Sequence, residues 1–523
     1  MRRGGMTPGP QAEVIAFLAD PSTHGLPAAE VPHIRTHISE IFFAGERVYK
    51  VKRAVRYSFV NFTALEDRHA ACLAEIGLNR RTAPDIYLGV AAVRRRPDGG
   101  LALDGLDRPA PGEAIEWAVV MTRFDEELVF DRLAGRGALE ARWIAPLVDA
   151  VVGLHEVAEV GGAPFGGAEG LRRLIAENAA DMATQLGALD PRSVAALNGR
   201  LEEGLGRHTA YLDARRARGF VRRCHGDLHL ANVVLWKGRP TLFDCIEFSE
   251  AIAVIDVAYD FAFLLMDLLV HGLDEFANQA LSRYVGRTGD AGATRVLPLM
   301  LALRASVRAK VNALALGGTA GGDARAELTA AARRYLAAAQ AFIAPAPPPH
   351  LVAFGGLSGS GKTTLARMLG PGLGRAPGAL HLRSDYIRKR LHHVLPEERL
   401  PREAYTREAN TRVYETLLAE AEEGLRAGQW VIADAVFARP GEREAIEAAA
   451  SRAGVPFHGV WLEAPAEVMS ARVETRTGDA SDATAEVVAL QTRYDTGEIA
   501  WSRFANSGGP EAVVAELRAH LAP

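Results

Sequence analysis

The sequence predicts two parts of different fold class: an α+β N-terminal part with two lobes, and an α/β C-terminal part with a mainly parallel sheet. In the first part, short strand-like segments extend to about residue 124 and are followed mostly by helical sequence. This order indicates a small β-rich lobe and a larger helical lobe. In the second part, amphipathic helices alternate with strand-like runs at 351–355, 379–382, 430–434 and 458–463. Such alternation favours parallel strands.

A proline-rich segment separates the two parts. Residues 344–349 read APAPPP, and prolines prevent a helix from continuing and favour an extended connector. We therefore expect one domain over 1–343, a linker over 344–349 and a second domain over 350–523.

The composition of the chain excludes several classes of protein. Its 523 residues include 60 Lys and Arg against 64 Asp and Glu, a net charge of −4, which disfavours nucleic acid as a partner. The cysteines Cys72, Cys224 and Cys245 form no C-x-x-C pair, so we expect neither a disulfide framework nor a cysteine-rich zinc site. The N-terminus lacks the apolar core of a signal peptide, and the apolar runs fall short of the ~20 residues that span a bilayer. We expect a cytoplasmic protein without a membrane segment, of undetermined oligomeric state.

The helical lobe contains a carboxylate loop. The segment FVRRCHGDLHLANVVLW holds His225, Asp227 and Asn232 in the pattern H-x-D-x-x-x-x-N, and Asp244 follows in the strand-like TLFDCIEF. The same pattern forms the catalytic loop of protein kinases, where the Asp accepts the proton of the acceptor hydroxyl and the Asn binds a metal ion. A second carboxylate on a nearby strand can hold the Mg²⁺ that bridges the phosphates.

These residues resemble the aminoglycoside phosphotransferase family and its choline and fructosamine kinase relatives, which share the protein-kinase-like fold. The resemblance implies that Asp227 is the catalytic base and that Asn232 and Asp244 bind Mg²⁺. It also implies that His225 keeps the loop in shape by hydrogen bonding.

The same resemblance implies a strand lysine that contacts the α and β phosphates and a helical glutamate that pairs with it. The segment GERVYKVKRAV offers Lys50 and Lys52 on one face of a strand, so the period of two cannot separate them. We favour Lys50. In the helical stretch 64–80, Glu75 is the better candidate for the partner and Glu66 is the alternative. No G-x-G-x-x-G loop precedes these residues, as is often the case among aminoglycoside phosphotransferases.

The C-terminal part opens on a phosphate loop. After the strand-like LVAF comes GGLSGSGKTT, which fits the pattern G-x-x-x-x-G-K-[ST]. In this pattern glycines turn backbone N–H groups toward a polyphosphate, and the following helix presents its positive end to the same anion. Lys362 is expected at the β and γ phosphates and Thr363 at Mg²⁺. The nucleotide-binding loop then consists of Gly356, Leu357, Ser358, Gly359, Ser360, Gly361, Lys362, Thr363 and Thr364.

Four charged residues after the loop complete the expected second site. Asp385, just after a strand-like run, is suited to handle an acceptor hydroxyl. Asp434 ends the strand-like WVIAD, where a carboxylate can hold Mg²⁺ directly or through water. Arg472 and Arg476 stand at helical i, i+4 spacing before a polar loop and can neutralise charge that develops during phosphoryl transfer.

Taken together, residues 350–523 resemble P-loop kinases of the gluconate kinase, adenylylsulfate kinase and zeta-toxin or chloramphenicol phosphotransferase group. The whole chain resembles a bacterial fusion of an aminoglycoside phosphotransferase-like domain with a P-loop kinase-like AAA-type ATP-binding domain. The resemblance implies an ATP- and Mg²⁺-dependent phosphotransferase with two nucleotide sites and a small-molecule hydroxyl acceptor. Two alternatives stay open: a P-loop ATPase or kinase regulated by a pseudokinase-like sensor domain, and a polynucleotide kinase-type activity in the C-terminal half.

Overall fold

A computed structural model of the chain describes residues 11–27, 30–57, 60–184, 188–318, 321–476 and 478–521. Its contacts divide the chain into two compact units. The first consists of Met1–Leu139, Gly153–Gly170 and Ala214–Asp260, and the second of Glu140–Val152, Leu171–Asp213 and Phe261–Pro523. The N-terminal residues 1–10, on which the expectation about a signal peptide partly depends, lie outside the described residues.

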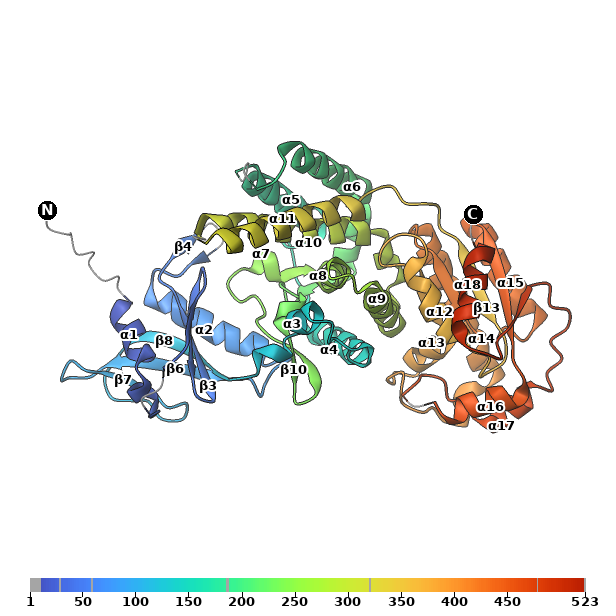
Figure 1. Cartoon of the computed structure of the whole chain (residues 1–523), viewed down its shortest axis with the longest axis horizontal. Helices are drawn as coiled ribbons and strands as arrows, with labels where there is room; N and C mark the ends of the chain where they lie inside the picture. Colours follow the sequence, from blue (N-terminus) through green and yellow to red (C-terminus); the bar gives the residue numbers. More distant parts are fainter. Residues whose placement is uncertain are drawn as a thin grey trace. The chain divides into compact units, whose positions relative to one another are not determined.

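The first unit contains a six-stranded antiparallel sheet with the order β1-β2-β3-β8-β6-β7. Helix α2 (Leu65–Asn79) packs on one face of this sheet and α1 (Ala12–Ala19) on the other (Figure 1). The strands are β1 (His33–Arg35), β2 (Ser39–Ala44), β3 (Arg47–Lys52), β6 (Tyr87–Arg95), β7 (Leu101–Leu103) and β8 (Glu113–Thr122). The expected β-rich lobe is therefore present.

Alternation along β3 decides which of its side chains face α2. Val48 belongs to the apolar cluster that includes Cys72 of α2, whereas Val51 belongs to the cluster on the α1 face. Because side chains alternate along a strand, Lys50 and Lys52 share the side of Val48. Both lysines therefore point toward α2.

The rest of the first unit supports the carboxylate loop. Strand β9 (Val221–Arg223) pairs with β12 (Val254–Asp256), and β10 (Val233–Trp236) pairs with β11 (Arg239–Leu242) in a hairpin. The hairpin turn, Lys237-Gly238, has φ values of 50° and 78°, as a type I′ turn requires. At the open end, Phe243 N–H donates to Asn232 O, so Asn232 and Asp244 come to the same edge. The smaller elements are η1 (Pro21–His24), β4 (Arg56–Tyr57), β5 (Val60–Asn61), η2 (Glu126–Leu128), α3 (Phe130–Gly135), η4 (Leu230–Asn232) and α7 (Glu250–Ala253).

The region between this unit and the proline-rich segment is helical, as expected. Four helices have residues in both units: α4 (Ile144–Val157), α5 (Gly167–Ala183), α6 (Pro191–Ala217) and α8 (Val257–Val270). Those wholly in the second unit are η3 (Ala141–Trp143), α9 (Asp274–Thr288), η5 (Ala291–Arg295), α10 (Leu297–Ala315), η6 (Leu316–Gly318) and α11 (Gly322–Phe342). Residues 345–350 contain neither helix nor strand. Among the described residues, every helix is too short or too polar to cross a membrane.

The second unit also contains a five-stranded sheet with the order β14-β15-β13-β16-β17, and all its strands are parallel. The prediction of a mainly parallel sheet is confirmed, and one strand, β17, was not predicted. From β13 the chain passes outward to β14, and from β15 it passes to β16 on the other side, so β13 lies at the point where the direction of winding reverses. The strands are β13 (Leu351–Gly355), β14 (Leu380–Arg383), β15 (Val431–Asp434), β16 (Phe457–Glu463) and β17 (Ser502–Ala505).

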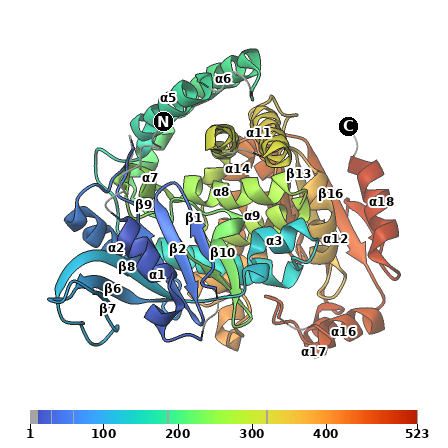
Figure 2. The same ribbon diagram turned by 60° about the vertical axis from the view of Figure 1, so that its left-hand side comes forward.

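Helices cover this parallel sheet. Apolar residues of α12 (Lys362–Leu369) and α18 (Pro510–Leu521) form one core with those of β13, β15 and β16, and α14 (Arg407–Arg426) and α15 (Pro440–Ala453) contact β15 and β16. The small helices α16 (Ala466–Glu474) and α17 (Ala485–Gln491) pack together beyond β16 (Figure 2). The remaining elements are η7 (Gly370–Gly372), α13 (Ser384–Leu391) and η8 (Arg402–Tyr405).

Candidate active sites

A buried ion-pair cluster joins β3, α2 and the segment after β11. Lys50 Nζ lies 2.8 Å from Glu75 Oε1 and 2.6 Å from Asp244 Oδ1. Lys52 Nζ lies 2.5 Å from Glu75 Oε2 and also contacts Glu247. Glu75 therefore bridges the two lysines that the strand pattern could not separate. Sequence analysis missed Glu247, whose only signal is its position three residues after Asp244.

Exposure distinguishes the two lysines. The Lys52 side chain is fully buried, whereas Lys50 is 12% exposed and contacts Asp244, which is 42% exposed. Burial of Glu75 opposes its ionisation, but the charges of Lys50 and Lys52 outweigh this and lower its pKa to about 2. Glu66, the alternative partner, is exposed at the start of α2. Lys50 thus lies at the accessible edge of the cluster, and Lys52 lies inside it.

The carboxylate loop brings Asp227 and Asn232 together. Asn232 Nδ2 donates to both the backbone oxygen and the Oδ2 atom of Asp227, at 2.9 Å each. Asp227 is 37% exposed, and His229 Nε2 lies 3.3 Å from its Oδ2. Sequence analysis assigned no role to His229, which is buried and contacts the carboxylate directly.

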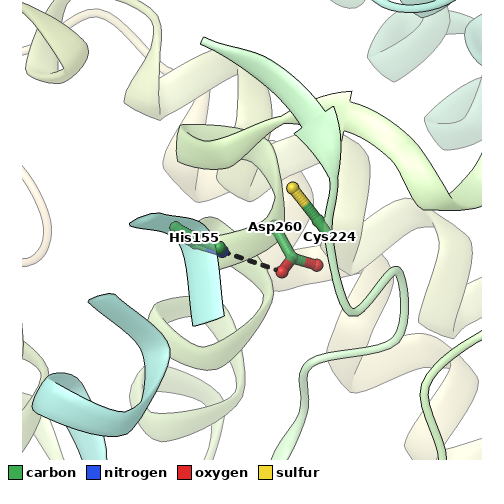
Figure 3. A group of neighbouring side chains, drawn as sticks. All are labelled: His155, Cys224 and Asp260. Atoms are coloured by element: carbon green, nitrogen blue, oxygen red, sulfur yellow. Dashed lines mark hydrogen bonds and ion pairs between the residues drawn. The ribbon is translucent and has the colours of Figure 1, made fainter. Parts of the chain in front are cut away.

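Asp260 of α8 fixes the start of this loop. Its carboxylate accepts the backbone N–H groups of His225 (3.1 Å) and Gly226 (2.9 Å) and lies 3.0 Å from His155 Nε2. Cys224 Sγ lies within 4.8 Å of the ligand atoms of His155 and Asp260 (Figure 3). It is also 3.5 Å from Ile255 O. The spacing of His155, Cys224 and Asp260 would suit a metal ion, but Asp260 is already a hydrogen-bond acceptor for the loop. We interpret the group as a support for the loop.

His225 ties the loop to the segment that carries Asp244. Its Nε2 lies 2.9 Å from Phe243 O, and its backbone oxygen accepts the N–H of Ile246 at 2.9 Å. Asp244 has a positive φ of 62°, and its N–H donates to the Tyr87 hydroxyl at 3.1 Å. These contacts therefore fix the loop that carries Asp227 against the segment that carries Asp244.

In the second unit, the phosphate loop connects β13 to α12. Gly359 and Gly361 have φ values of 83° and 96°, and a Cβ at Gly359 would lie 2.5 Å from Met469 O, so the loop needs glycine there. Lys362 Nζ donates to Gly356 O at 2.8 Å and to Leu357 O at 3.0 Å. Ser360 is buried within the loop, and Ser358 N–H donates to Gln491 Oε1.

Thr363 and Asp434 meet beside this loop. Thr363 Oγ1 donates to Asp434 Oδ2 at 2.6 Å, and His381 Nε2 lies 3.1 Å from the same oxygen. Burial opposes the charge of Asp434, but the contact with His381 and the charges of Lys362 and Arg383 hold its pKa far below the usual value. An ionised carboxylate next to a hydroxyl at the end of a phosphate loop is a suitable ligand pair for Mg²⁺. Thr364, by contrast, is exposed on α12.

The other predicted residues of this half lie around the same edge of the sheet. Asp385 is the second residue of α13, which directly follows β14, and burial raises its pKa against the charge of Arg383. Arg472 Nη1 lies 3.4 Å from Gly359 O in the phosphate loop. Arg476 Nη1 lies 3.6 Å from Asp479 Oδ1. Arg472 thus reaches the phosphate loop, and Arg476 pairs with the polar segment that follows α16.

Sequence analysis assigned no role in the small-molecule kinase site to Arg383, the last residue of β14. Its side chain is buried, and its Nη2 donates to Asp479 Oδ1 at 2.8 Å. Its guanidinium also lies over the Tyr386 ring, 4.7 Å from the centroid. Only its place two residues before Asp385 could have drawn attention to it.

Comparison with known proteins identifies the family. The uncharacterized proteins Rv2004c of Mycobacterium tuberculosis and Mb2027c of Mycobacterium bovis are each 30% identical to the chain over 494 residues, which cover 90% of this chain and 93% of each relative. The chain belongs to the family of these mycobacterial proteins. Its residues 90–298 match the Phosphotransferase enzyme family and its residues 351–495 match an AAA domain.

These matches confirm the expected fusion of an aminoglycoside phosphotransferase-like domain with a P-loop kinase-like domain. They also confirm the predicted fold class and the assignment as an ATP-dependent kinase. Solved structures similar to parts of the chain include a choline kinase from Cryptosporidium parvum Iowa II (12% identical, 59% of this chain and 88% of that one, TM-score 0.37). Others are a gluconokinase from Sinorhizobium meliloti 1021 (20%, 33% and 90%, 0.24) and the Mycobacterium tuberculosis APS kinase CysC (21%, 34% and 98%, 0.23).

Proposed function

We propose that this kinase has two nucleotide sites and that each transfers the γ-phosphoryl group of ATP to a hydroxyl of a small molecule with the help of Mg²⁺. The observation that carries the proposal is common to both units: a lysine stands near oxygen ligands suited to Mg²⁺. In the first unit Lys50 contacts Asp244, and in the second Lys362 belongs to the loop that precedes the Thr363–Asp434 pair.

At the first site, Asp227 is the proposed base. Asn232 donates to its Oδ2, which would orient the other carboxylate oxygen toward an acceptor hydroxyl, and the partial exposure of Asp227 leaves room for that approach. Lys50, held by Glu75, would contact the α and β phosphates, while Asn232 and Asp244 would bind Mg²⁺. The metal ion would neutralise charge on the phosphates.

At the second site, Lys362 and the N–H groups of the loop would hold the β and γ phosphates, and Thr363 and Asp434 would bind Mg²⁺. Asp385 is the proposed base, and its raised pKa supports the role because a general base works best with a pKa nearer to the ambient pH. Arg472 and Arg476 would neutralise charge on the group in transfer.

The acceptor is proposed to be a small molecule rather than nucleic acid, since the chain carries a net charge of −4 and binding to a polyanion needs a basic surface. We also propose that the domain boundary is the proline-rich segment 344–349.

The test is transfer of label from γ-labelled ATP into a fractionated small-molecule extract. It compares the unaltered chain, Asp227→Asn, Lys362→Ala and a control, Lys237→Ala, which changes an exposed lysine of the β10–β11 turn. We expect Asp227→Asn to lower one labelled product by about 10²- to 10⁴-fold, Lys362→Ala to remove another, and the control to remove neither. If no product forms and only Lys362→Ala lowers phosphate release, the regulated ATPase alternative replaces the two-site kinase.

A further inference from the structure

Helix α9 packs against β14, the edge strand of the parallel sheet, within the second unit. Its sequence lies in the region matched by the Phosphotransferase enzyme family. Asn278 Nδ2 donates to Ala379 O at 2.8 Å, and Ser282 Oγ accepts the N–H of His381 at 3.2 Å. β14 is an edge strand, and an edge with unpaired backbone groups needs a cover. A helix from the phosphotransferase region provides that cover.

The contact centres on Arg283 of α9 and Tyr386 of α13. Arg283 is 2% exposed and makes ion pairs with Asp149 (2.5 Å) and Glu397 (2.6 Å). Its guanidinium lies 5.4 Å from the centroid of the Tyr386 ring, and Arg383 lies 4.7 Å from the same centroid. Arg283 Nη1 is also 3.4 Å from the Tyr386 hydroxyl. The ring is therefore held by two arginines, one from α9 and one from β14.

A glycine permits this close approach. A Cβ at Gly286 would lie 2.4 Å from Cδ2 of Tyr386, a separation that side chains do not tolerate without a shift. One turn of α9 is further tied to α13, since Arg390 Nη1 donates to the backbone oxygens of Val285 and Gly286 at 3.0 Å each.

Tyr386 lies between Arg283 of α9 and Arg383, a neighbour of the residues proposed to act at the second site. It directly follows Asp385, the proposed base, and contacts Arg383, which binds Asp479 and lies 3.9 Å from Asp434. A change in the position of Tyr386 would therefore move Asp385 and Arg383, while the phosphate loop lies on a different strand and helix.

We propose that Arg283 is a positioning residue of the P-loop site, which acts through Tyr386 to fix Asp385 and Arg383. The phosphotransferase region then supplies a working part of the second site, and phosphoryl transfer by the P-loop half depends on α9. The effect on turnover rests on the proposed role of Asp385, whereas the effect on the order of α13 does not.

The test uses the full chain in an Asp227→Asn background, which silences the first site. Phosphate release from ATP and Mg²⁺ is measured for Arg283→Ala, Arg283→Lys and the control Arg287→Ala. Arg287 lies one turn further on α9 and pairs with Asp149 (2.6 Å), a partner that it shares with Arg283. Hydrogen exchange of the α13 amides is measured in the same variants.

We expect Arg283→Ala to lower kcat about tenfold or more with little change in the KM for ATP, because small displacements at a reacting centre cost large factors in rate. We also expect faster exchange in α13, partial recovery with Arg283→Lys, and neither effect with Arg287→Ala. If Arg283→Ala does not fold, Gly286→Ala removes no charge and should give the same kcat and exchange changes.

Two results would overturn the proposal: unchanged exchange and kcat in Arg283→Ala, or equal effects in Arg287→Ala. Lys362→Ala in the same background distinguishes a failure of the proposal about Arg283 from a failure of the proposed P-loop function. If phosphate release survives Lys362→Ala, the P-loop function is wrong, and the exchange of α13 still decides whether Arg283 positions it.

Discussion

The substitution Glu75→Gln tests the ion-pair cluster of the first unit most directly. Glutamine has the same shape but no charge, so Lys50 and Lys52 would lose the anion that lies between them, 2.8 Å and 2.5 Å away. Both lysines are within the same buried cluster, and only Lys50 is partly exposed. The change should therefore reduce the stability of the β-rich lobe.

The size of this loss can be worked out from the pKa of Glu75. The two lysines outweigh burial and lower it from 4.5 to about 2, which corresponds to roughly 3 kcal/mol of stability at neutral pH. Removal of one member from a buried ion pair costs about 3–5 kcal/mol in general, which is consistent with this value. Because the pKa is lowered on folding, this stability is fully present above pH 4.5. It is lost as the pH falls from 4.5 toward 2.

Hydrogen exchange of the α2 amides is the suitable assay, since a chain of several domains does not unfold in one transition. At pH 7 and low urea, Glu75→Gln should accelerate exchange of the slowest α2 amides by roughly a hundredfold. At pH 3 the difference should fall to roughly half its free-energy value. The control is Glu66→Gln, an exposed residue of the same helix. A difference below about 1 kcal/mol at pH 7, or one that is constant down to pH 3, would refute the reasoning.

Four further substitutions test other parts of the two sites. Lys52→Met should cost about 3–5 kcal/mol of stability. Lys50→Met should weaken ATP binding more than it lowers stability, because Lys50 is at the accessible edge of the cluster. Calorimetry measures the ATP affinity of the two variants, and thermal unfolding measures their stability. Thr363→Val should raise the Mg²⁺ concentration needed for ATP binding about tenfold, since it removes a hydrogen bond to a charged group. Asp260→Ala should speed hydrogen exchange of the His225 and Gly226 amides, because both N–H groups donate to the Asp260 carboxylate.

Sequence reasoning was most informative where functional residues are close along the chain. The phosphate loop and its helix come from consecutive residues, so their arrangement is set by local backbone geometry. Sequence alone could not choose between Lys50 and Lys52, because a strand places both side chains on one face. What distinguishes them is the depth of burial and the second partner, Asp244 for Lys50 and Glu247 for Lys52, and both depend on how β3 packs against distant segments.

Contacts between distant segments account for the features that sequence reasoning missed. Asp260 binds the loop from 34 residues away in sequence, and its only signal was an acidic residue within an apolar run. β17 was missed because one of its four residues is buried, whereas all four residues of β14 and of β15 are buried and lie in largely apolar runs that mark a strand. Arg283 lies 103 residues from Tyr386, and nothing in its helix indicates that a second site depends on it.

The two proposed bases are held in different ways, and this difference predicts how each half behaves when it is separated from the other. Asp227 is fixed by Asn232, five residues away in its own loop. Asp385 is half-buried in the first turn of α13, and the helix that holds its neighbour Tyr386 lies before the proline-rich segment. A chain that begins at His350 would retain the phosphate loop but lose Arg283. It should therefore bind ATP with Mg²⁺ and turn it over more slowly than the full chain, and equal rates would contradict the dependence on α9.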